Sequence, residues 1–141
     1  MSEENVEIVR AAYAAFNRRD FKAVSEFLHP ELEWHPYLGA VEGSIYRGRD
    51  AVVKMWSDLD DSFGGSLRVE PVEVIDRGEQ IIVVIDAHGT GSGSGAEVRQ
   101  SWAQVATLRD GLIWHVEPYP DRLSALEAAG LSGRRSRRGR R

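Results

Sequence analysis

The sequence predicts an α+β domain in which helices come first and a sheet follows. Apolar residues recur at three- and four-residue intervals over much of the chain before Gly64, and at two-residue intervals from Leu67 onward. Helices that precede a run of strands are typical of a curved antiparallel or mixed sheet with helices on one face, not of alternating βαβ units.

The N-terminal segment predicts a long helix followed by a short one. The apolar face of the first helix requires burial and consists of Val6, Val9, Ala12, Tyr13 and Phe16. Asp20 can cap the second helix, which we expect to extend through Leu28. Pro30 then stops it, because proline cannot donate the helical hydrogen bond.

A strand and a third helix are predicted next. Residues 32–36 alternate apolar and polar side chains before a glycine-rich segment. Asp50 can cap the third helix, in which Val52 and Trp56 are apolar, and the glycines at 64–65 end it.

The second half of the chain predicts strands linked by hairpins and a closing helix. The expected strands are residues 67–69, 72–74, 81–85, 98–108 and 112–119. A closing helix is expected from Pro120 to Ala129, with Leu123, Leu126 and Leu131 towards the body and Gly130 at its end.

Composition indicates one ordinary globular domain. The chain has 141 residues, of which 42% are hydrophobic and 28% charged. The absence of cysteine excludes disulfides, a thiolate nucleophile and cysteine-ligated zinc, and fits a reducing compartment. The N-terminus lacks the features of a signal peptide, and the longest apolar run, residues 81–85, is too short for a bilayer. We therefore expect a cytoplasmic protein without a membrane segment.

The basic residues are concentrated at the C-terminus. Six of the 18 are arginines within residues 134–141, and the remaining 12 face 22 acidic residues, a net charge of −10. The body is therefore not expected to bind nucleic acid, and the Arg-rich tail is the one segment with the charge to do so. Because the tail lacks apolar residues, we expect one domain over residues 1–131 and a disordered tail over residues 132–141.

Two further signals are set aside. Residues 91–96 match a dinucleotide-binding glycine pattern, but the segment that follows is predicted as a strand and not as the helix that this site needs. The chain's histidines, His29, His35, His88 and His115, lack the spacing of a helical metal motif. We therefore expect no metal site and no cofactor.

Four segments carry a resemblance to a known family: residues 13–20, 27–36, 46–56 and 108–119. In them the chain resembles the SnoaL-like members of the nuclear-transport-factor-two-like superfamily, which includes polyketide cyclases, ketosteroid isomerases, limonene epoxide hydrolases and scytalone dehydratases. The resemblance implies a cone-shaped, cystatin-like α+β barrel whose strongly curved sheet wraps the long N-terminal helix. It also implies an apolar pocket open at one end, and often a homodimer. Fold alone does not decide function in such a superfamily.

The resemblance implies three candidate catalytic residues. His35 precedes Pro36, where the similar isomerases place a catalytic aspartate, and a histidine can transfer protons near neutral pH. Glu117 is the local equivalent of the acid/base carboxylate of the cyclases, and His115 lies two residues before it on the same strand face. Steroid isomerisation is not expected, because Tyr13 is about one position out of register and Gln104 or a neighbour takes the place of the protonated acid of ketosteroid isomerase.

The candidate substrate-binding residues are mainly aromatic: Tyr13, Phe16, Trp34, Trp56, Trp102, Gln104 and Tyr119. Strict alternation places Ile113, His115, Glu117 and Tyr119 on one face of the last strand. If that face lines the cone, His35, His115 and Glu117 converge with Gln104. Each of these residues also has an ordinary structural interpretation, in core packing or on a solvated sheet face.

Three functions remain open at this stage. The first is a cofactor-free isomerase or cyclase acting on an apolar, enolisable carbonyl compound. The second is a non-catalytic module that binds a small apolar or aromatic molecule. The third is a dimeric interaction domain whose cone is filled by aromatic side chains. An inward direction of His35 and Glu117 favours the first, and a filled interior favours the third.

Overall fold

The computed structural model describes residues 2–37 and 44–138 of the chain. Its helices are α1 (Ser2–Asn17), α2 (Phe21–Glu26), α3 (Arg49–Ser62) and α4 (Arg122–Arg138). Its strands are β1 (Leu28–Trp34), β2 (Tyr46–Arg47), β3 (Arg68–Arg77), β4 (Gln80–Thr90), β5 (Glu97–Arg109) and β6 (Leu112–Tyr119). No helix in this part of the chain is both long and apolar enough to span a membrane.

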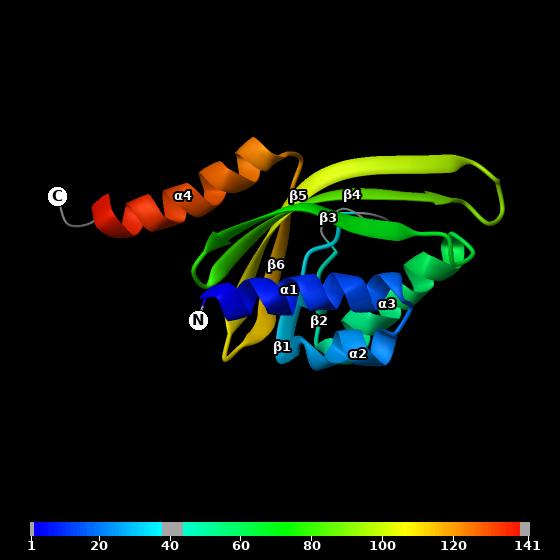
Figure 1. Cartoon of the computed structure of the whole chain (residues 1–141), viewed down its shortest axis with the longest axis horizontal. Helices are drawn as coiled ribbons and strands as arrows, with labels where there is room; N and C mark the ends of the chain where they lie inside the picture. The colour runs from blue at the N-terminus through cyan, green and yellow to red at the C-terminus, as the bar shows by residue number, and fades with distance from the viewer. Residues whose placement is uncertain (1, 38–43, 139–141) are drawn as a thin grey trace.

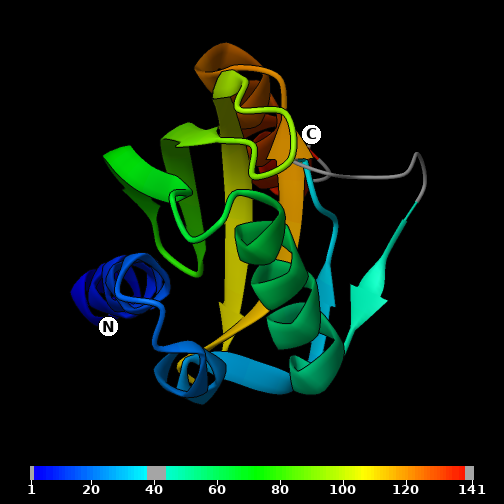
Figure 2. The same ribbon diagram turned by 90° about the vertical axis from the view of Figure 1, so that its right-hand side faces the viewer.

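The strands form one mixed sheet in the order β2-β1-β6-β5-β4-β3. Neighbouring strands are antiparallel except β1 and β6, which are parallel. Helices α1, α2 and α3 lie on one side of the curved sheet and α4 on the other (Figures 1 and 2). The predicted α+β class and the N-terminal helix against a curved sheet are confirmed, but the sheet is open and is not a closed barrel.

The main core lies between the sheet and helices α1 to α3. We call this side of the sheet the inner face. Phe16 of α1 is 1% exposed, and its ring centroid lies 4.4 Å from that of Trp56 on α3. The ring centroid of Trp56 in turn lies 5.0 Å from that of Trp34 on β1, and the two rings pack edge to face. Three of the aromatic residues that the sequence singled out therefore meet in one interior cluster.

A second, smaller core lies on the opposite side, which we call the outer face. Val105 and Ala103 of β5 pack there against Ala125 and Ala129 of α4, and all four are buried. These small side chains let α4 lie close to the sheet. Leu123, by contrast, is 65% exposed, so its predicted place against the body is wrong.

Polar side chains fix the turn after α1 to the elements around it. The Asn17 side-chain amide donates to the Val69 carbonyl and accepts from the Val69 amide, both at 2.9 Å. Arg19 has a φ of 62°, and its guanidinium binds the Asp60 carboxylate at 3.0 Å. The same guanidinium donates to the Leu67 carbonyl at 2.6 Å. These contacts hold α1, the end of α3 and β3 in one arrangement.

Helix boundaries differ from the prediction at two positions in the first half. Helix α2, capped by the predicted Asp20 side chain, ends at Glu26, and β1 passes through Pro30. Proline is accommodated because the β1–β6 pairing is irregular between Leu28 and Glu33, so the ladder needs no amide there. Gly48, with a φ of 88°, stands at the start of α3 in place of the predicted Asp50 cap.

The last helix is longer than predicted. Helix α4 continues past Gly130, the predicted end, to Arg138. Glycine costs a helix about 1 kcal/mol relative to alanine but does not by itself end one. The domain boundary at residue 131 and the disorder of the tail stay predictions.

Candidate functional site

The interior of the cone contains two small, adjoining apolar cavities. The first has a volume of about 20 Å³ and is lined by Val9, Ala12, Tyr13, Phe16, Val24, Leu28, Trp34, Val52, Trp56, Gln104, Ala106, Ile113 and Val116. The second has a volume of about 30 Å³ and is lined by Trp34, Pro36, Tyr37, Met55, Trp56, Leu59, Val69, Trp102 and Gln104. Trp34, Trp56 and Gln104 line both. Each cavity has room for about one or two water molecules.

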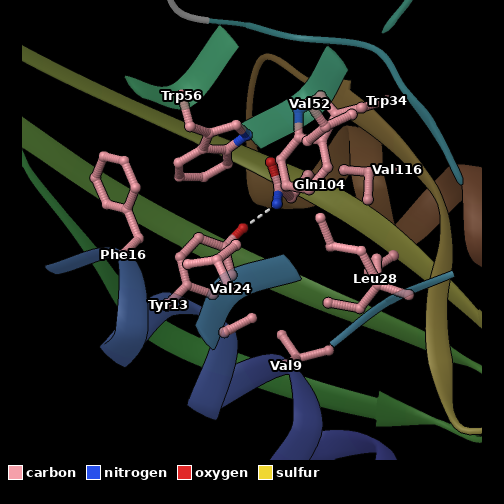
Figure 3. A pocket seen from close by; sticks show the side chains of 13 residues that line it. Val9, Tyr13, Phe16, Val24, Leu28, Trp34, Val52, Trp56, Gln104 and Val116 are labelled. Atoms are coloured by element: carbon pink, nitrogen blue, oxygen red, sulfur yellow. Dashed lines mark hydrogen bonds between the residues drawn. The ribbon is translucent and has the colours of Figure 1, made fainter. Parts of the chain in front are cut away.

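Gln104 is the polar centre of this interior. It is 4% exposed, and its side-chain nitrogen donates to the Tyr13 hydroxyl across the first cavity (Figure 3). Its side-chain oxygen accepts from the Trp102 indole N–H at 3.3 Å. Burial raises the pKa of Tyr13 well above its ordinary value of 10.0, so its hydroxyl stays neutral at every physiological pH.

Trp56 carries an unsatisfied donor at the wall between the two cavities. Its indole nitrogen is buried and has no hydrogen-bond partner. Figure 3 shows this nitrogen on the side of the ring that faces Gln104. A buried N–H without a partner destabilises the folded protein by about 1–3 kcal/mol. A ligand with an acceptor at this position would remove that penalty when it binds.

The three candidate catalytic residues lie elsewhere, in a cluster where two of them contact Glu33 and the third contacts His115. The His35 and His115 Nε2 atoms lie 3.0 Å and 3.3 Å from Glu33 Oε1, and Arg47 Nε lies 3.2 Å from Glu33 Oε2. Glu117 Oε1 is 3.8 Å from His115 Nδ1. The hydrogen bond from His35, assisted by the charge of Arg47, holds the pKa of Glu33 below its ordinary value.

This cluster lies on the outer face of the sheet. Glu117 pairs with Val105, which packs under α4, and His115 pairs with Thr107 two residues further along β5. Directly opposed residues on neighbouring strands point to the same side, so both belong to the outer face. Gln104 belongs to the inner face, and the convergence of His35, His115 and Glu117 with Gln104 that the alternation suggested does not occur.

A bulge in β6 explains the difference. Leu108 pairs with Ile113 but Thr107 pairs with His115, so Trp114 is an extra residue in the ladder. Ile113 is therefore buried in the main core, and the predicted common face for Ile113, His115 and Glu117 is wrong.

The candidate binding residues divide between the two faces. Tyr13, Phe16, Trp34, Trp56 and Gln104 line the first cavity, and Trp102 lines the second. Tyr119 instead packs against the small core on the outer face, where burial and then the charge of Glu117 raise its pKa.

Two residues of these sites were missed by reasoning from the sequence. Tyr37 lies flat on Trp102, with ring centroids 5.2 Å apart and planes inclined by 14°. Glu33 stands between the buried Leu32 and Trp34, so strand alternation alone places it on the opposite face and marks it as a partner for His35.

The sequence of residues 9–116 matches the SnoaL-like domain family. The chain belongs to that family. The predicted membership of the nuclear-transport-factor-two-like superfamily, with its SnoaL-like and ketosteroid isomerase-like folds, is confirmed. A search of curated proteins gave no match.

Several solved structures have the same fold. The SnoaL-like chain is 25% identical to an NTF2-like protein of unknown function from Burkholderia pseudomallei, with a TM-score of 0.73 over 88% of this chain and 95% of that one. TerC, co-crystallised with polyporic acid, is 26% identical, with a TM-score of 0.71 over 90% and 98%. A Catenulispora acidiphila protein with a ketosteroid isomerase-like fold, in complex with trimethylamine, is 18% identical, with a TM-score of 0.71 over 88% and 92%.

Proposed function

We propose that this SnoaL-like protein binds one small aromatic molecule that carries a carbonyl acceptor, in the interior between α1, α3 and the inner face. The unpartnered Trp56 N–H carries the proposal, because it is a donor held in an apolar site without an acceptor. The lining is otherwise apolar, with Gln104 and Tyr13 as fixed polar groups, as in small-molecule sites generally. The co-crystal of TerC with polyporic acid, at 26% identity, also supports a ligand in this fold.

Binding requires Trp56 to turn. Cavities of about 20 Å³ and 30 Å³ hold water but no aromatic ring, and Trp56 forms part of the wall of both. Rotation of its side chain joins them into one space between Trp34 and Gln104. The ligand would then lie beside the turned indole and accept a hydrogen bond from its N–H.

Acetophenone and cumene provide a matched pair of probes. They have nearly the same shape, but acetophenone has a carbonyl where cumene has a carbon with a methyl group. We expect acetophenone to bind about fivefold more tightly in a titration followed by tryptophan fluorescence, since a hydrogen bond contributes about 1 kcal/mol. Trp56→Phe, which keeps an aromatic ring but removes the N–H, should abolish the difference. Equal binding of the two probes would exclude the Trp56 N–H as the recognition group, and no binding of either would leave the interior as a filled core.

A second candidate is a cofactor-free isomerase or cyclase with His35, Glu117 and His115 as acid/base groups. One observation favours it: His35 and His115 both contact Glu33, and Glu117 lies beside the other ring nitrogen of His115. Among the described residues that line the two cavities, however, the ionisable side chains are tyrosines, Tyr13 and Tyr37. A ligand in the interior would thus meet no carboxylate or imidazole among them, which is why binding without chemistry is preferred.

Exchange of the acetophenone methyl protons for deuterium separates the two candidates. The binding module should leave the exchange rate at its value in buffer. An enzyme that uses His35 should accelerate it, and His35→Ala should then reduce the acceleration about 10²–10⁴-fold. The homodimer and the cytoplasmic location implied at the outset stay predictions.

A further inference from the structure

Three possible metal ligands meet at one point on the outer face of the sheet. Glu33 Oε1 lies 3.0 Å from His35 Nε2 and 3.3 Å from His115 Nε2. One donor atom from each of the three residues lies within 4.8 Å of the other two. Strand alternation brings Glu33 and His35 together, but Glu33 and His115 are 82 positions apart and meet only through the parallel pairing of β1 and β6.

The spacing matches the coordination shell of a tetrahedral divalent metal. Zinc binds imidazole nitrogen at about 2.0–2.1 Å and carboxylate oxygen at about 2.0–2.2 Å, so neighbouring ligand atoms in a tetrahedron are about 3.4 Å apart. The two Glu33–histidine distances, 3.0 Å and 3.3 Å, lie near that value. A cation at the centre would replace hydrogen bonds with coordinate bonds after only a small movement of the side chains.

The backbone holds the three residues in place. Glu33 and His115 are directly paired between β1 and β6. The His35 amide donates to the Val116 carbonyl at 3.0 Å, which extends the same ladder by one residue. Two ligands on paired strands and a third bound to that pair form a rigid site, which reduces the entropy lost on binding.

The surroundings also suit a metal. Glu117 Oε1 faces the other ring nitrogen of His115, Nδ1, at 3.8 Å. A small movement that closes this distance would let the carboxylate accept a hydrogen bond from Nδ1–H and leave Nε2 as the metal-binding atom. The side chains of Glu33, His35 and His115 are 31%, 27% and 28% exposed, so a cation can enter and water can complete the shell.

Arg47 is the one described cation in contact with Glu33. Its Nε donates to Glu33 Oε2 at 3.2 Å, which leaves Oε1 to the histidines. The Arg47 side chain is 69% exposed and can move into solvent when a cation binds. Its charge opposes a second cation nearby, so its removal should strengthen metal binding.

We propose that Glu33, His35 and His115 form a zinc site on the outer face of this protein, with water as the fourth ligand and Glu117 orienting His115. This site is separate from the interior cavities and does not depend on the proposed ligand. It revises the expectation from histidine spacing that the chain has no metal site.

Zinc binding to the untagged full-length chain tests the proposal. We expect one Zn²⁺ per chain by isothermal titration calorimetry, and the same stoichiometry by competition with a chromophoric chelator. His35→Ala and His115→Ala should each weaken binding by more than about tenfold, and Glu117→Gln by about tenfold. Arg47→Gln should strengthen binding several-fold. His88→Ala, a histidine on β4 outside the cluster, is the matched control and should leave the affinity unchanged.

Nuclear magnetic resonance of the histidine rings gives a second readout on the unmodified protein. Zn²⁺ should shift the Nε2 signals of His35 and His115 and leave those of His29 and His88 in place. The proposal is overturned if the unmodified chain binds no zinc at a metal concentration of about 100 µM. It is equally overturned if His35→Ala and His115→Ala bind as the unmodified chain does, or if Arg47→Gln binds more weakly.

Discussion

The two faces of one sheet use similar hydrogen bonds for different purposes. On the inner face, Gln104 bonds to Tyr13 and Trp102 at sites less than 7% exposed. On the outer face, Glu33 bonds to His35 and His115, with side chains between a quarter and a third exposed. Buried polar groups must have hydrogen-bond partners for the chain to fold, whereas partly exposed groups can exchange their partners for water, ions or ligands. The inner network is therefore a determinant of the fold, and the outer cluster is open to binding.

The largest expected effect is on the inner face, at Trp56. Trp56→Ala removes the ring that packs on Phe16 and Trp34. The substitution also joins the two cavities. We expect the free energy of unfolding to fall by about 3–5 kcal/mol, because both burial and packing are lost. Urea denaturation measures this loss. A loss below about 1 kcal/mol would mean that the interior collapses around the missing ring, and the two faces would then differ less than we infer.

Gln104→Leu should have the next largest effect. It keeps the volume of the side chain but leaves the Tyr13 hydroxyl and the Trp102 N–H without partners. We expect a loss of about 1–3 kcal/mol in the same urea experiment. The double variant Tyr13→Phe, Gln104→Leu should lose less stability than the sum of the losses in the two single variants. Each single variant removes the same Gln104–Tyr13 hydrogen bond, which can be lost only once. Additive losses would show that the two residues are not coupled.

Because of Tyr13 on the inner side, the free energy of unfolding should decrease at alkaline pH. Burial raises the pKa of folded Tyr13 above the ordinary 10.0, so the unfolded chain loses this proton first. The stability that Tyr13 contributes is therefore complete below pH 10 and decreases as the pH rises from there towards the raised pKa. Between pH 10 and 11 the Tyr13→Phe variant should lose about 1 kcal/mol less than the unmodified chain. Parallel pH profiles of the two proteins would contradict this assignment.

The smallest effect is expected on the outer face. His115→Ala removes one contact to Glu33 from a surface where water replaces it. In metal-free buffer we expect the free energy of unfolding to stay within about 0.5 kcal/mol of the unmodified value. A loss comparable to that of Gln104→Leu would show that the outer cluster is also part of the folding core.

Much of this fold could be predicted from local sequence patterns. The period-two segments after Leu67 are strands, Asp20 caps α2, and the aromatic residues from α1, β1 and α3 meet in the core. Local patterns succeed there because each element buries one face of its own. Gly130 misled the prediction because a single glycine weakens a helix without ending it.

The candidate site was harder to predict, because it depends on pairing between distant segments. Strict alternation through β6 fails at Trp114, and no local signal marks the bulge. The contact of Glu33 with His115 needs the parallel pairing of β1 and β6. The local sequence of either strand does not show which strand it pairs with. The sequence therefore identified most of the participating side chains but assigned some of them to the wrong face.

The bulge at Trp114 has a consequence for how such chains can diverge. Because Trp114 is an extra residue between Ile113 and His115, its deletion would turn that stretch into a regular ladder without moving either neighbour to the other face. A deletion elsewhere in β6 would reverse the direction of every side chain beyond it. Natural length variation in this strand should therefore concentrate at this one position, and alignments of relatives should place their gaps there.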